Sequence, residues 1–311
     1  AGGMFRALPP PAMFASFNPA HLGLEVSLEE GLALAERHGF GGLDPAIESL
    51  HAAVSQQGAQ RVREALLGRG LRVGAWCLPF VPYAADEEEW QAGLKKLPTL
   101  LGSAAAVGAR RAFMWILPGD NERGYAINFE HHLVRFRPVA RLLADYGIRL
   151  GLEFVGPEST RRAFKYPFIH TLAGVLELGR AIGPNCGLLL DSWHWHCAGG
   201  TVAEIAALQG EQIVNVHVND APLGIARNDL QDFRRKLPGT TGVLDLDGFI
   251  HALADVGYYG PITAEPFDPE LNALPPEEAV SLTAKATRGA VARASRRTDR
   301  SLGEAVPVGR G

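Results

Sequence analysis

The sequence has few cysteines, no surplus of positive charge and no long apolar run, and each absence excludes a class of protein. Three cysteines, Cys77, Cys186 and Cys197, are too few and too far apart for a disulfide framework. With 30 basic and 34 acidic residues, the formal net charge of −4 argues against a protein that binds nucleic acid through a cationic surface. The chain has no apolar run of about 18 residues, so we expect no membrane span. It also lacks the cationic start and apolar stretch of a secretion signal, so we expect a cytoplasmic protein.

What the sequence does have is a regular spacing of glycines. The chain of 311 residues is 47% hydrophobic and 21% charged, which is typical of a globular protein with a sizeable core. Seven glycines, 27 to 47 residues apart, each follow a segment with helical periodicity and precede a short apolar run; they are Gly39, Gly70, Gly108, Gly147, Gly183, Gly210 and Gly257. Glycine just past a helix commonly takes the left-handed conformation that ends it. Seven such junctions separate eight strand-and-helix units.

Eight short apolar runs are the candidate strands of these units. They are 12–17, 40–44, 71–78, 110–116, 148–155, 186–191, 212–219 and 261–266. Eight strand-and-helix units in about 300 residues predict a (β/α)8 TIM barrel, with a doubly wound open sheet as the structural alternative. We expect one barrel domain over 1–311, with a short N-terminal extension (1–11) and a polar C-terminal tail (about 297–311). The long connection 220–244 is expected to be an active-site loop of that domain.

Ionisable residues stand at the C-terminal ends of four consecutive candidate strands, the end at which barrel enzymes carry their active sites. They are Glu153, Asp191, His217 and Glu265. Each has an alternative explanation: an ion pair with Arg149 for Glu153, a helix cap for Asp191, a core histidine for His217 and a rim position for Glu265. Four successive strand ends favour a shared site, because buried carboxylates that converge repel one another unless a cation lies between them. Three oxygen ligands and one nitrogen suit Mn²⁺, Mg²⁺, Co²⁺ or Zn²⁺.

Several blocks of the sequence carry a resemblance to a known family. They are LEFVG at 152–156, GLLLDSWHWH at 187–196, VHVND at 216–220, LPG at 237–239 with LDL at 244–246, and AEPF at 264–267. Over about residues 148–290 the chain resembles the xylose isomerase-like barrel superfamily, and within it the inosose (2-keto-myo-inositol) isomerase branch of inositol catabolism. The resemblance implies a single divalent metal ion held by Glu153, Asp191, His217 and Glu265. It also implies that Glu153 and Glu265 flank the substrate and move protons.

Five further residues are candidate substrate contacts: His194, Arg235, Trp115, Trp76 and Glu158. His194 follows Asp191 by three residues, so it can lean over the same bound substrate; a hydrogen bond to another site residue is its alternative role. The resemblance implies an arginine before the Pro-Gly turn, and Arg234 competes with Arg235 for that place. The two tryptophans stand near the ends of the third and fourth strands, where either would wall the pocket or simply pack the barrel.

These residues predict a metal-dependent isomerase or epimerase of a keto-polyol or ketose. A divalent ion acidifies the C–H beside a carbonyl, a carboxylate removes the proton, and the resulting enediolate is reprotonated on the neighbouring carbon or on the opposite face. A dehydratase that expels a hydroxyl from the same enediolate is the alternative, and a non-catalytic sugar-binding barrel or an apurinic-site endonuclease is less favoured. The expected partner is a small polyol or sugar. The exact substrate, its stereochemistry, the metal and any homo-oligomer stay open.

Overall fold

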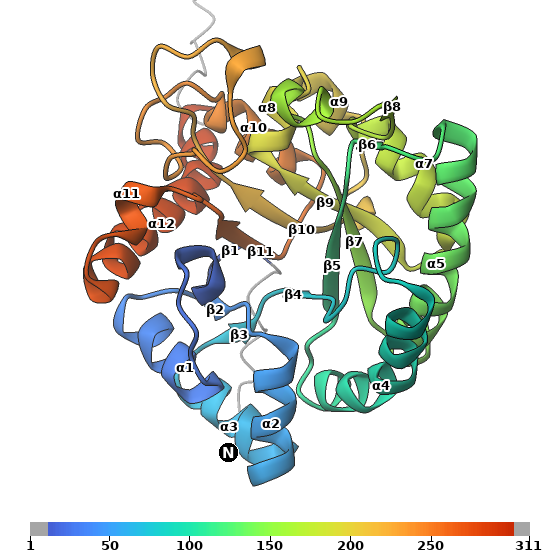
Figure 1. Ribbon diagram of the computed structural model, residues 1–311. Coiled ribbons are helices and arrows are strands. Elements are labelled where there is room, and N and C mark those ends of the chain that lie inside the picture. The colour runs from blue at the N-terminus through green and yellow to red at the C-terminus, as the bar shows by residue number, and fades with distance from the viewer. Residues whose placement is uncertain (1–11, 302–311) are drawn as a thin grey trace, which may run out of the picture.

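The computed structural model describes residues 12–301, which form a ring of parallel strands surrounded by helices (Figure 1). The strands of the main sheet are β1 (Phe14–Phe17), β2 (Gly42–Leu43), β3 (Arg72–Val73), β4 (Trp76–Cys77), β5 (Arg111–Ile116), β7 (Arg149–Phe154), β9 (Cys186–Asp191), β10 (Ile213–Val218) and β11 (Pro261–Ala264). A separate antiparallel pair joins β6 (Gly119–Asp120) to β8 (Tyr166–Pro167). Each of the eight predicted strand ranges contains at least one strand of the main sheet.

The ring closes through a strand that is split in two. The hydrogen-bonded order of the sheet is β3-β2-β1-β11-β10-β9-β7-β5-β4, so β3 and β4 lie at its two ends. β3 pairs with β2 and β4 pairs with β5, although only Gly74 and Ala75 separate β3 from β4 along the chain. The predicted strand 71–78 is therefore two short strands that share the third place of a (β/α)8 barrel. This closure confirms the barrel and excludes the open sheet.

A buried carboxylate supports the split strand. Asp44, one residue after β2, is 1% exposed, and its Oδ1 accepts a hydrogen bond from the backbone N–H of Ala75 at 3.0 Å. The hydroxyl groups of Ser16 and Thr263 donate to the same carboxylate at 2.5 and 2.7 Å. A Cβ on Gly74 would lie 1.8 Å from Asp44 Oδ1, so a larger residue does not fit there. Asp44 thus connects β1 and β11 to the junction between β3 and β4.

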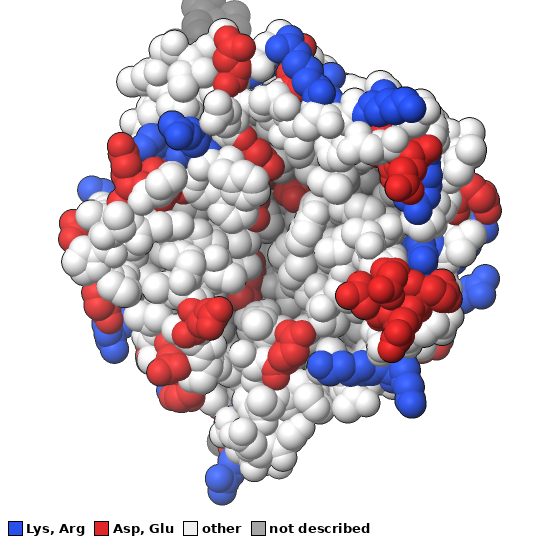
Figure 2. Space-filling model, viewed as in Figure 1, with Lys and Arg blue, Asp and Glu red and all other residues white. Residues whose placement is uncertain are grey.

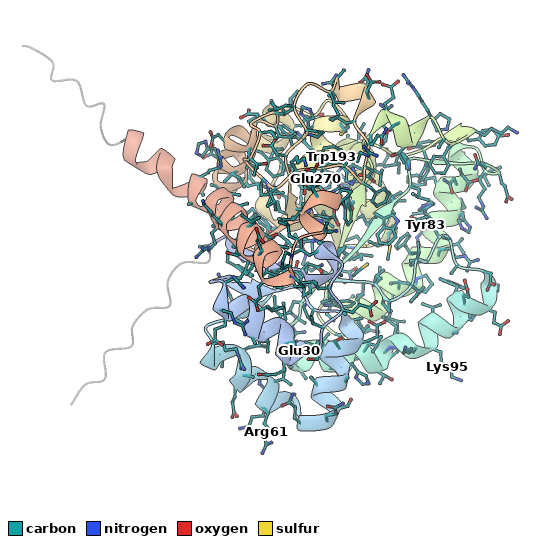
Figure 3. The ribbon with its side chains drawn as sticks, turned by 60° about the vertical axis from the view of Figure 1, so that its left-hand side comes forward. Glu30, Arg61, Tyr83, Lys95, Trp193 and Glu270 are labelled. Carbon is teal, nitrogen blue, oxygen red and sulfur yellow. The ribbon has the colours of Figure 1, made fainter. Side chains whose placement is uncertain are left out.

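Helices follow the strands and cover the outside of the ring. The longer ones are α1 (Leu28–Arg37), α2 (Ile47–Gln57), α3 (Ala59–Gly68), α4 (Glu87–Ala106), α5 (Tyr125–Asp145), α7 (Leu172–Ile182), α10 (Leu246–Asp255) and α12 (Pro276–Ser301). The short ones are η1 (Pro19–Leu22), α6 (Glu158–Arg161), α8 (Ser192–Cys197), α9 (Val202–Ala206), η2 (Gly210–Gln212), η3 (Arg227–Asp229) and α11 (Pro269–Asn272). In Figure 3, Arg61 of α3 and Lys95 of α4 point outward, whereas Trp193 of α8 lies among other side chains inside the molecule.

The helix ends follow from local sequence. Ser27 opens α1 with a capping box, in which its Oγ accepts from the backbone of Glu30 and the Glu30 carboxylate accepts from the backbone of Ser27. Five of the seven regularly spaced glycines have positive φ angles of 65° to 80°, as predicted. Gly183 and Gly210 do not, because Gly183 is extended at φ 176° and Gly210 opens η2. A Cβ on Gly210 would lie 2.6 Å from the backbone of Gly257, so close packing rather than backbone conformation requires this glycine.

The main hydrophobic core fills the space between the ring and its helices. Fully buried side chains from the helices, such as Leu50, Leu97, Phe136 and Phe249, pack against the outer faces of the strands. No helix within residues 12–301 is long and apolar enough to cross a membrane. The expected N-terminal extension 1–11 and residues 302–311 of the expected tail lie outside the described residues. The first part of that tail continues α12, which runs to Ser301.

Candidate functional site

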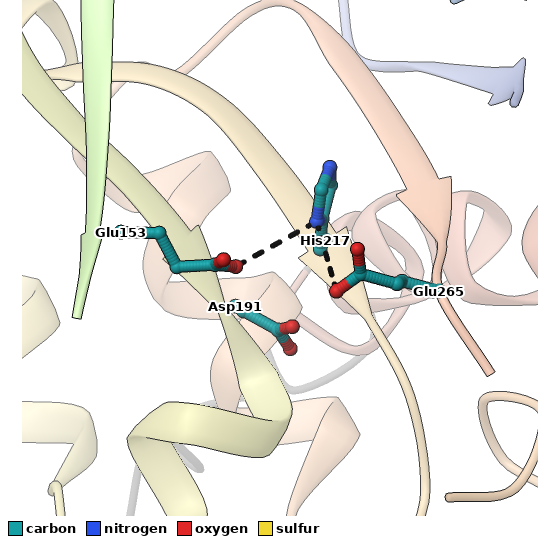
Figure 4. A group of neighbouring side chains, drawn as sticks. All are labelled: Glu153, Asp191, His217 and Glu265. Carbon is teal, nitrogen blue, oxygen red and sulfur yellow. Dashed lines mark ion pairs between the residues drawn. The ribbon is translucent and has the colours of Figure 1, made fainter. Parts of the chain in front are cut away.

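Four ionisable side chains meet at the C-terminal ends of β7, β9, β10 and β11 (Figure 4). Glu153 stands in β7, Asp191 ends β9, His217 stands in β10 and Glu265 directly follows β11. Each offers one ligand atom, and these atoms all lie within 4.8 Å of one another. The structure therefore brings together the four residues that the sequence placed at strand ends. The face of the barrel shown in Figure 2 is hollowed at its centre, and acidic side chains line the hollow.

The local sequence explains why these groups converge. Strands β9 and β10 are buried along almost their whole length, as parallel strands covered by helices must be. The strands are in parallel register, with His217 opposite Asp191 and Trp115 opposite Glu153. Parallel partners at the same level direct their side chains to the same face of the sheet, so alternation carries the polar groups into the barrel while their neighbours pack outward.

Burial changes the acidity of the two glutamates in opposite directions. Burial, together with the carboxylates of Glu265 and Asp191, raises the pKa of Glu153 well above its ordinary value. Burial alone would also raise the pKa of Glu265, but His217, His21 and Arg235 hold it well below its ordinary value. Two carboxyl groups of the same type therefore differ strongly in how readily they hold a proton.

Several polar atoms of the cluster are buried without a hydrogen-bond partner. They are Nδ1 and Nε2 of His217 and Oε1 of Glu153. His217 Nδ1 lies 3.7 Å from Glu153 Oε1 and 3.4 Å from Glu265 Oε2, the two ion pairs drawn in Figure 4. A buried polar atom without a partner is costly, and three carboxylate donors with one imidazole are ligands for Mn²⁺, Mg²⁺, Co²⁺ or Zn²⁺. The residues present therefore fit a divalent ion.

Arg235 supplies positive charge at the edge of this cluster. Its side chain is 1% exposed, and Nη1 donates to Asp191 Oδ2 at 2.9 Å and to Glu265 Oε2 at 2.8 Å. Nη2 donates to Asp232 Oδ1 at 2.7 Å. Arg234, the competitor for this place in the sequence, is exposed. The loop predicted at 220–244 thus delivers an arginine to the cluster, and its neighbour Asp232 is a site residue that the sequence analysis missed.

His194 lies beside the cluster, in the short helix α8 that follows β9. Its Nδ1 accepts a hydrogen bond from the backbone N–H of Gly156 at 3.2 Å. Its Nε2 lies 3.3 Å from Arg235 Nη2 and 4.0 Å from Glu153 Oε2. The side chain is 2% exposed. The histidine three residues after Asp191 therefore lies beside the cluster, and its contact with a substrate stays a prediction.

Of the two predicted tryptophan contacts, Trp115 lies next to the cluster and Trp76 does not. Trp115 is 36% exposed and stands next to Glu153 across the β5–β7 ladder. Trp76 is fully buried in the main core, where its indole N–H donates to the carbonyl of Ala109 at 3.2 Å, so the structure corrects its prediction as a pocket wall. Side chains alternate along β4, so the next residue, Cys77, points to the opposite face of the sheet. There it packs against Ala75, Phe113 and Leu189, whose side chains lie inside the ring.

The Cys77 thiol faces the interior of the ring, whereas Glu158, a predicted substrate contact, lies apart from the cluster. Burial, with the charges of Glu265 and Glu153, raises the pKa of the Cys77 thiol to about 12. Glu158 opens α6, and its carboxylate pairs with Arg162 at 2.5 Å. That ion pair directs the Glu158 carboxylate to its own helix, so the structure gives it no contact with the cluster.

His21 is the other site residue that the sequence analysis missed. It lies in η1, just after β1, and its Nε2 is 3.2 Å from Glu265 Oε1. Its ring also meets the ring of His217 edge-on, with centroids 5.1 Å apart. No repeated spacing or motif marks this residue, because it follows the strand by four positions within a Pro-containing turn. Only the folded chain brings it to Glu265.

Comparisons with known proteins agree with this architecture. The xylose isomerase-like TIM barrel family matches residues 32–289. The inosose isomerase of Bacillus subtilis (strain 168) is 33% identical over 148 residues, which cover 46% of this chain and 48% of that protein, so the chain matches about half the length of such curated relatives. A xylose isomerase domain protein from Alicyclobacillus acidocaldarius subsp. acidocaldarius is 31% identical, with a TM-score of 0.79 and coverage of 91% of this chain and 100% of that chain. The crystal structure of the IOLI protein with a binding zinc atom has a TM-score of 0.74 at 22% identity, with coverage of 90% and 99%, which supports the fold alone.

Proposed function

Because the chain belongs to the xylose isomerase-like TIM barrel family, we propose that it is a divalent-metal-dependent isomerase or epimerase of a keto-polyol or ketose of the inosose type. The observation that carries the proposal is the cluster of Glu153, Asp191, His217 and Glu265, whose ligand atoms lie within 4.8 Å of one another at the open end of the barrel. The match to about half the length of an inosose isomerase supports the choice of substrate class.

The four residues of the cluster would hold one divalent ion, Mn²⁺, Zn²⁺, Co²⁺ or Mg²⁺. When bound, such an ion polarises the carbonyl group of a hydroxyketone and so acidifies the neighbouring C–H. The unpartnered nitrogens of His217 and the unpartnered Oε1 of Glu153 support this assignment, because each of these buried atoms needs a partner.

Glu153 and Glu265 are the residues proposed to move protons. Glu153 stands in β7 and Glu265 directly follows β11, on either side of β9 and β10, so they approach the centre of the cluster from two directions. One carboxylate removes the proton from carbon, and the other is placed to return or accept a proton from the opposite side of the substrate. Return to the neighbouring carbon gives isomerisation, and return to the opposite face of the same carbon gives epimerisation.

Three residues around the cluster are proposed to orient the substrate. Trp115, partly exposed next to Glu153, presents an apolar face against which the C–H groups of a polyol can pack. Arg235 and His194 lie beside the cluster with nitrogen atoms 3.3 Å apart, and these nitrogens are proposed to bind hydroxyl or carbonyl oxygens of a substrate. Such an arrangement suits an uncharged, hydroxyl-rich molecule.

The experiment that tests the proposal measures metal binding and C–H exchange in the same preparation. The protein is loaded with Mn²⁺, its metal content is determined, and it is incubated in heavy water with 2-keto-myo-inositol or fructose. We expect about one ion per chain, deuterium on a carbon next to the carbonyl, and a rearranged ketone. His217→Ala should bind less metal, whereas His132→Ala, which removes a buried histidine outside the cluster, should bind as much as the unaltered protein.

Each other result contradicts the proposal in a different way. A product with a new double bond or a second carbonyl, formed with loss of water, would make the protein a dehydratase. Metal-loaded protein that causes no exchange with a range of inososes and ketoses would make it a binding protein. Unchanged metal content in His217→Ala would remove that ligand from the assignment.

A further inference from the structure

We propose that His21 is a positioning residue that holds the Glu265 carboxylate in its working orientation, an inference that rests on the proposed function of that carboxylate. The reason is that one imidazole ring contacts both the backbone and the side chain at the end of β11. Its Nδ1 lies 3.1 Å from the carbonyl oxygen of Ala264, and its Nε2 lies 3.2 Å from Glu265 Oε1. The ring therefore spans the end of the strand and the carboxylate that follows it.

The local fold around His21 restricts its ring independently of the contact with Glu265. His21 lies in η1, which begins after Asn18 with Pro19 at its first turn and ends at Gly23 with φ 71°. The Asn18 side chain accepts a hydrogen bond from the backbone N–H of Ala20 at 3.1 Å and so caps this turn. His21 is 7% exposed. A short, capped turn and a buried ring leave the side chain little freedom, which is what a positioning residue requires.

The contact distinguishes the two oxygens of the carboxylate. Oε1 of Glu265 faces His21, whereas Oε2 faces the cluster, at 2.8 Å from Arg235 Nη1 and 3.4 Å from His217 Nδ1. A glutamate side chain has three rotatable bonds, and its last torsion is broad, so a carboxylate held through one oxygen alone can turn. A neutral imidazole carries one N–H, so the tautomer with its hydrogen on Nε2 is the one that donates to Oε1, and Oε2 then stays directed at the cluster.

Two ring contacts keep the imidazole itself in place. Its ring meets the ring of His217 at 79° with centroids 5.1 Å apart, and that of Phe267 at 70° with centroids 5.9 Å apart. His21 therefore touches two of the four cluster residues, Glu265 through a nitrogen and His217 through its ring. Residues in contact with metal-ligating side chains commonly change metal affinity or activity by about 10- to 100-fold when they are replaced.

The test uses two substitutions that each keep one polar end of the ring. His21→Gln places an amide near the position of Nε2, facing Glu265, and His21→Asn places one near the position of Nδ1, facing Ala264. Both contacted oxygens accept hydrogen bonds, so an amide NH2 can donate at either place. His21→Phe removes both contacts, and His132→Phe is the matched control, since His132 is a buried histidine that stacks on Tyr83 away from the cluster.

The readouts are the dissociation constant for Co²⁺, the visible absorption spectrum of the Co²⁺-loaded protein, and kcat and KM, with folding verified by thermal melting. We expect His21→Phe and His21→Asn to weaken Co²⁺ binding by about 10- to 100-fold and to change the spectrum. We expect His21→Gln to stay near the unaltered protein, and the loss in the other variants to appear in kcat more than in KM. A ring with only a packing role would affect melting but would not distinguish Gln from Asn.

The results separate this inference from the proposed function. Co²⁺ affinities and spectra that are equal in all the His21 variants would overturn the inference, and so would equal recovery by Gln and Asn. Unaltered protein that binds Co²⁺ but turns over no hydroxyketone would refute the proposed function, while the comparison of Gln with Asn would still test whether His21 orients Glu265.

Discussion

The loop that carries Arg235 is held by one carboxylate, and replacing that carboxylate gives the sharpest test of the fold around the site. Asp220 is 1% exposed and follows β10. Its Oδ2 accepts hydrogen bonds from the backbone N–H groups of Thr241 and Gly242 at 3.0 and 2.8 Å. Its Oδ1 accepts from those of Val243 and Leu244, both at 3.1 Å. The carboxylate therefore organises a turn more than twenty residues away along the chain.

The same residue holds the neighbourhood of Arg235 through its backbone. The N–H of Asp220 donates to the carbonyl of Lys236 at 2.8 Å, and the N–H of Lys236 donates back to Asp220 at 2.9 Å. Lys236 is the neighbour of Arg235, so Asp220 joins both ends of the segment 236–244 to β10. We predict that Asp220→Asn destabilises the protein and displaces Arg235 with this segment.

The expected loss of stability follows from the hydrogen bonds. An amide keeps one acceptor oxygen and puts an NH2 group in place of the other, so at least two backbone N–H groups lose their acceptor and face a donor. A hydrogen bond to a charged group contributes about 1.5 to 3 kcal/mol, so two of them give about 3 kcal/mol at the lower end. We expect Asp220→Asn to lower the free energy of unfolding by about that amount.

The assay is urea unfolding at several pH values. Backbone hydrogen bonds lower the pKa of Asp220 despite its burial. Because its pKa is depressed in the folded state, its contribution is present above the unfolded pKa of about 3.9 and is lost as the pH falls through the folded pKa. The difference in stability between Asp220→Asn and the unaltered protein should therefore be full near pH 7 and shrink below pH 4.

Asp229→Asn is the matched control, because Asp229 is exposed in the same loop. It should change the unfolding free energy by less than about 0.5 kcal/mol. If Asp220→Asn were as stable as Asp229→Asn at pH 7, the carboxylate would not organise the turn. A difference that stayed constant down to pH 2 would refute the argument from its charge.

Two further predictions concern the site. With metal at saturation, Glu153→Gln and Glu265→Gln should each lose about 10²- to 10⁴-fold in turnover, whereas Asp191→Asn should lower metal affinity and recover its turnover with excess metal. Solvent-deuterium exchange at verified metal occupancy measures these effects. Exchange at the unaltered rate in Glu265→Gln would exclude the role of Glu265 as a base. Trp115→Ala should raise KM with little change in melting temperature, and Trp76→Ala should lower the free energy of unfolding by about 3 to 5 kcal/mol, since the Trp76 indole is fully buried. Steady-state kinetics and urea unfolding measure the two effects. A change of KM in Trp76→Ala alone, with a loss of stability in Trp115→Ala alone, would contradict the placement of the two rings.

The sequence predicted the features that depend on short-range regularity. The barrel followed from the repeated units, and the cluster followed from polar residues that end apolar runs, such as Asp191 after Leu188–Leu190. The repeated units and the polar strand ends are both local signals, because each can be recognised from consecutive residues. The capping box at Ser27 is local in the same sense, because Glu30 follows Ser27 by three residues.

The sequence could not predict features that depend on how distant segments meet. His21 reaches Glu265 across most of the chain, and Asp220 reaches the turn at 241–244 only through the conformation of its loop. The error at Trp76 came from register: a strand expected to run unbroken through 71–78 is interrupted at Gly74 and Ala75, so the sequence did not show which residue of the pair Trp76 and Cys77 faces the interior.

The split third strand gives the barrel a joint at which the strand ladders are short. β5 and β7 are paired over six positions, whereas β2 with β3 and β4 with β5 are each paired over two. At this joint the side chain of Asp44 contributes connections that a longer ladder of backbone hydrogen bonds makes elsewhere. We therefore expect a change in the circumference of the ring to be accommodated between residues 73 and 76, where β3 and β4 are not paired with each other, so that Asp44, which is not a member of the cluster, bears on the width of the ring.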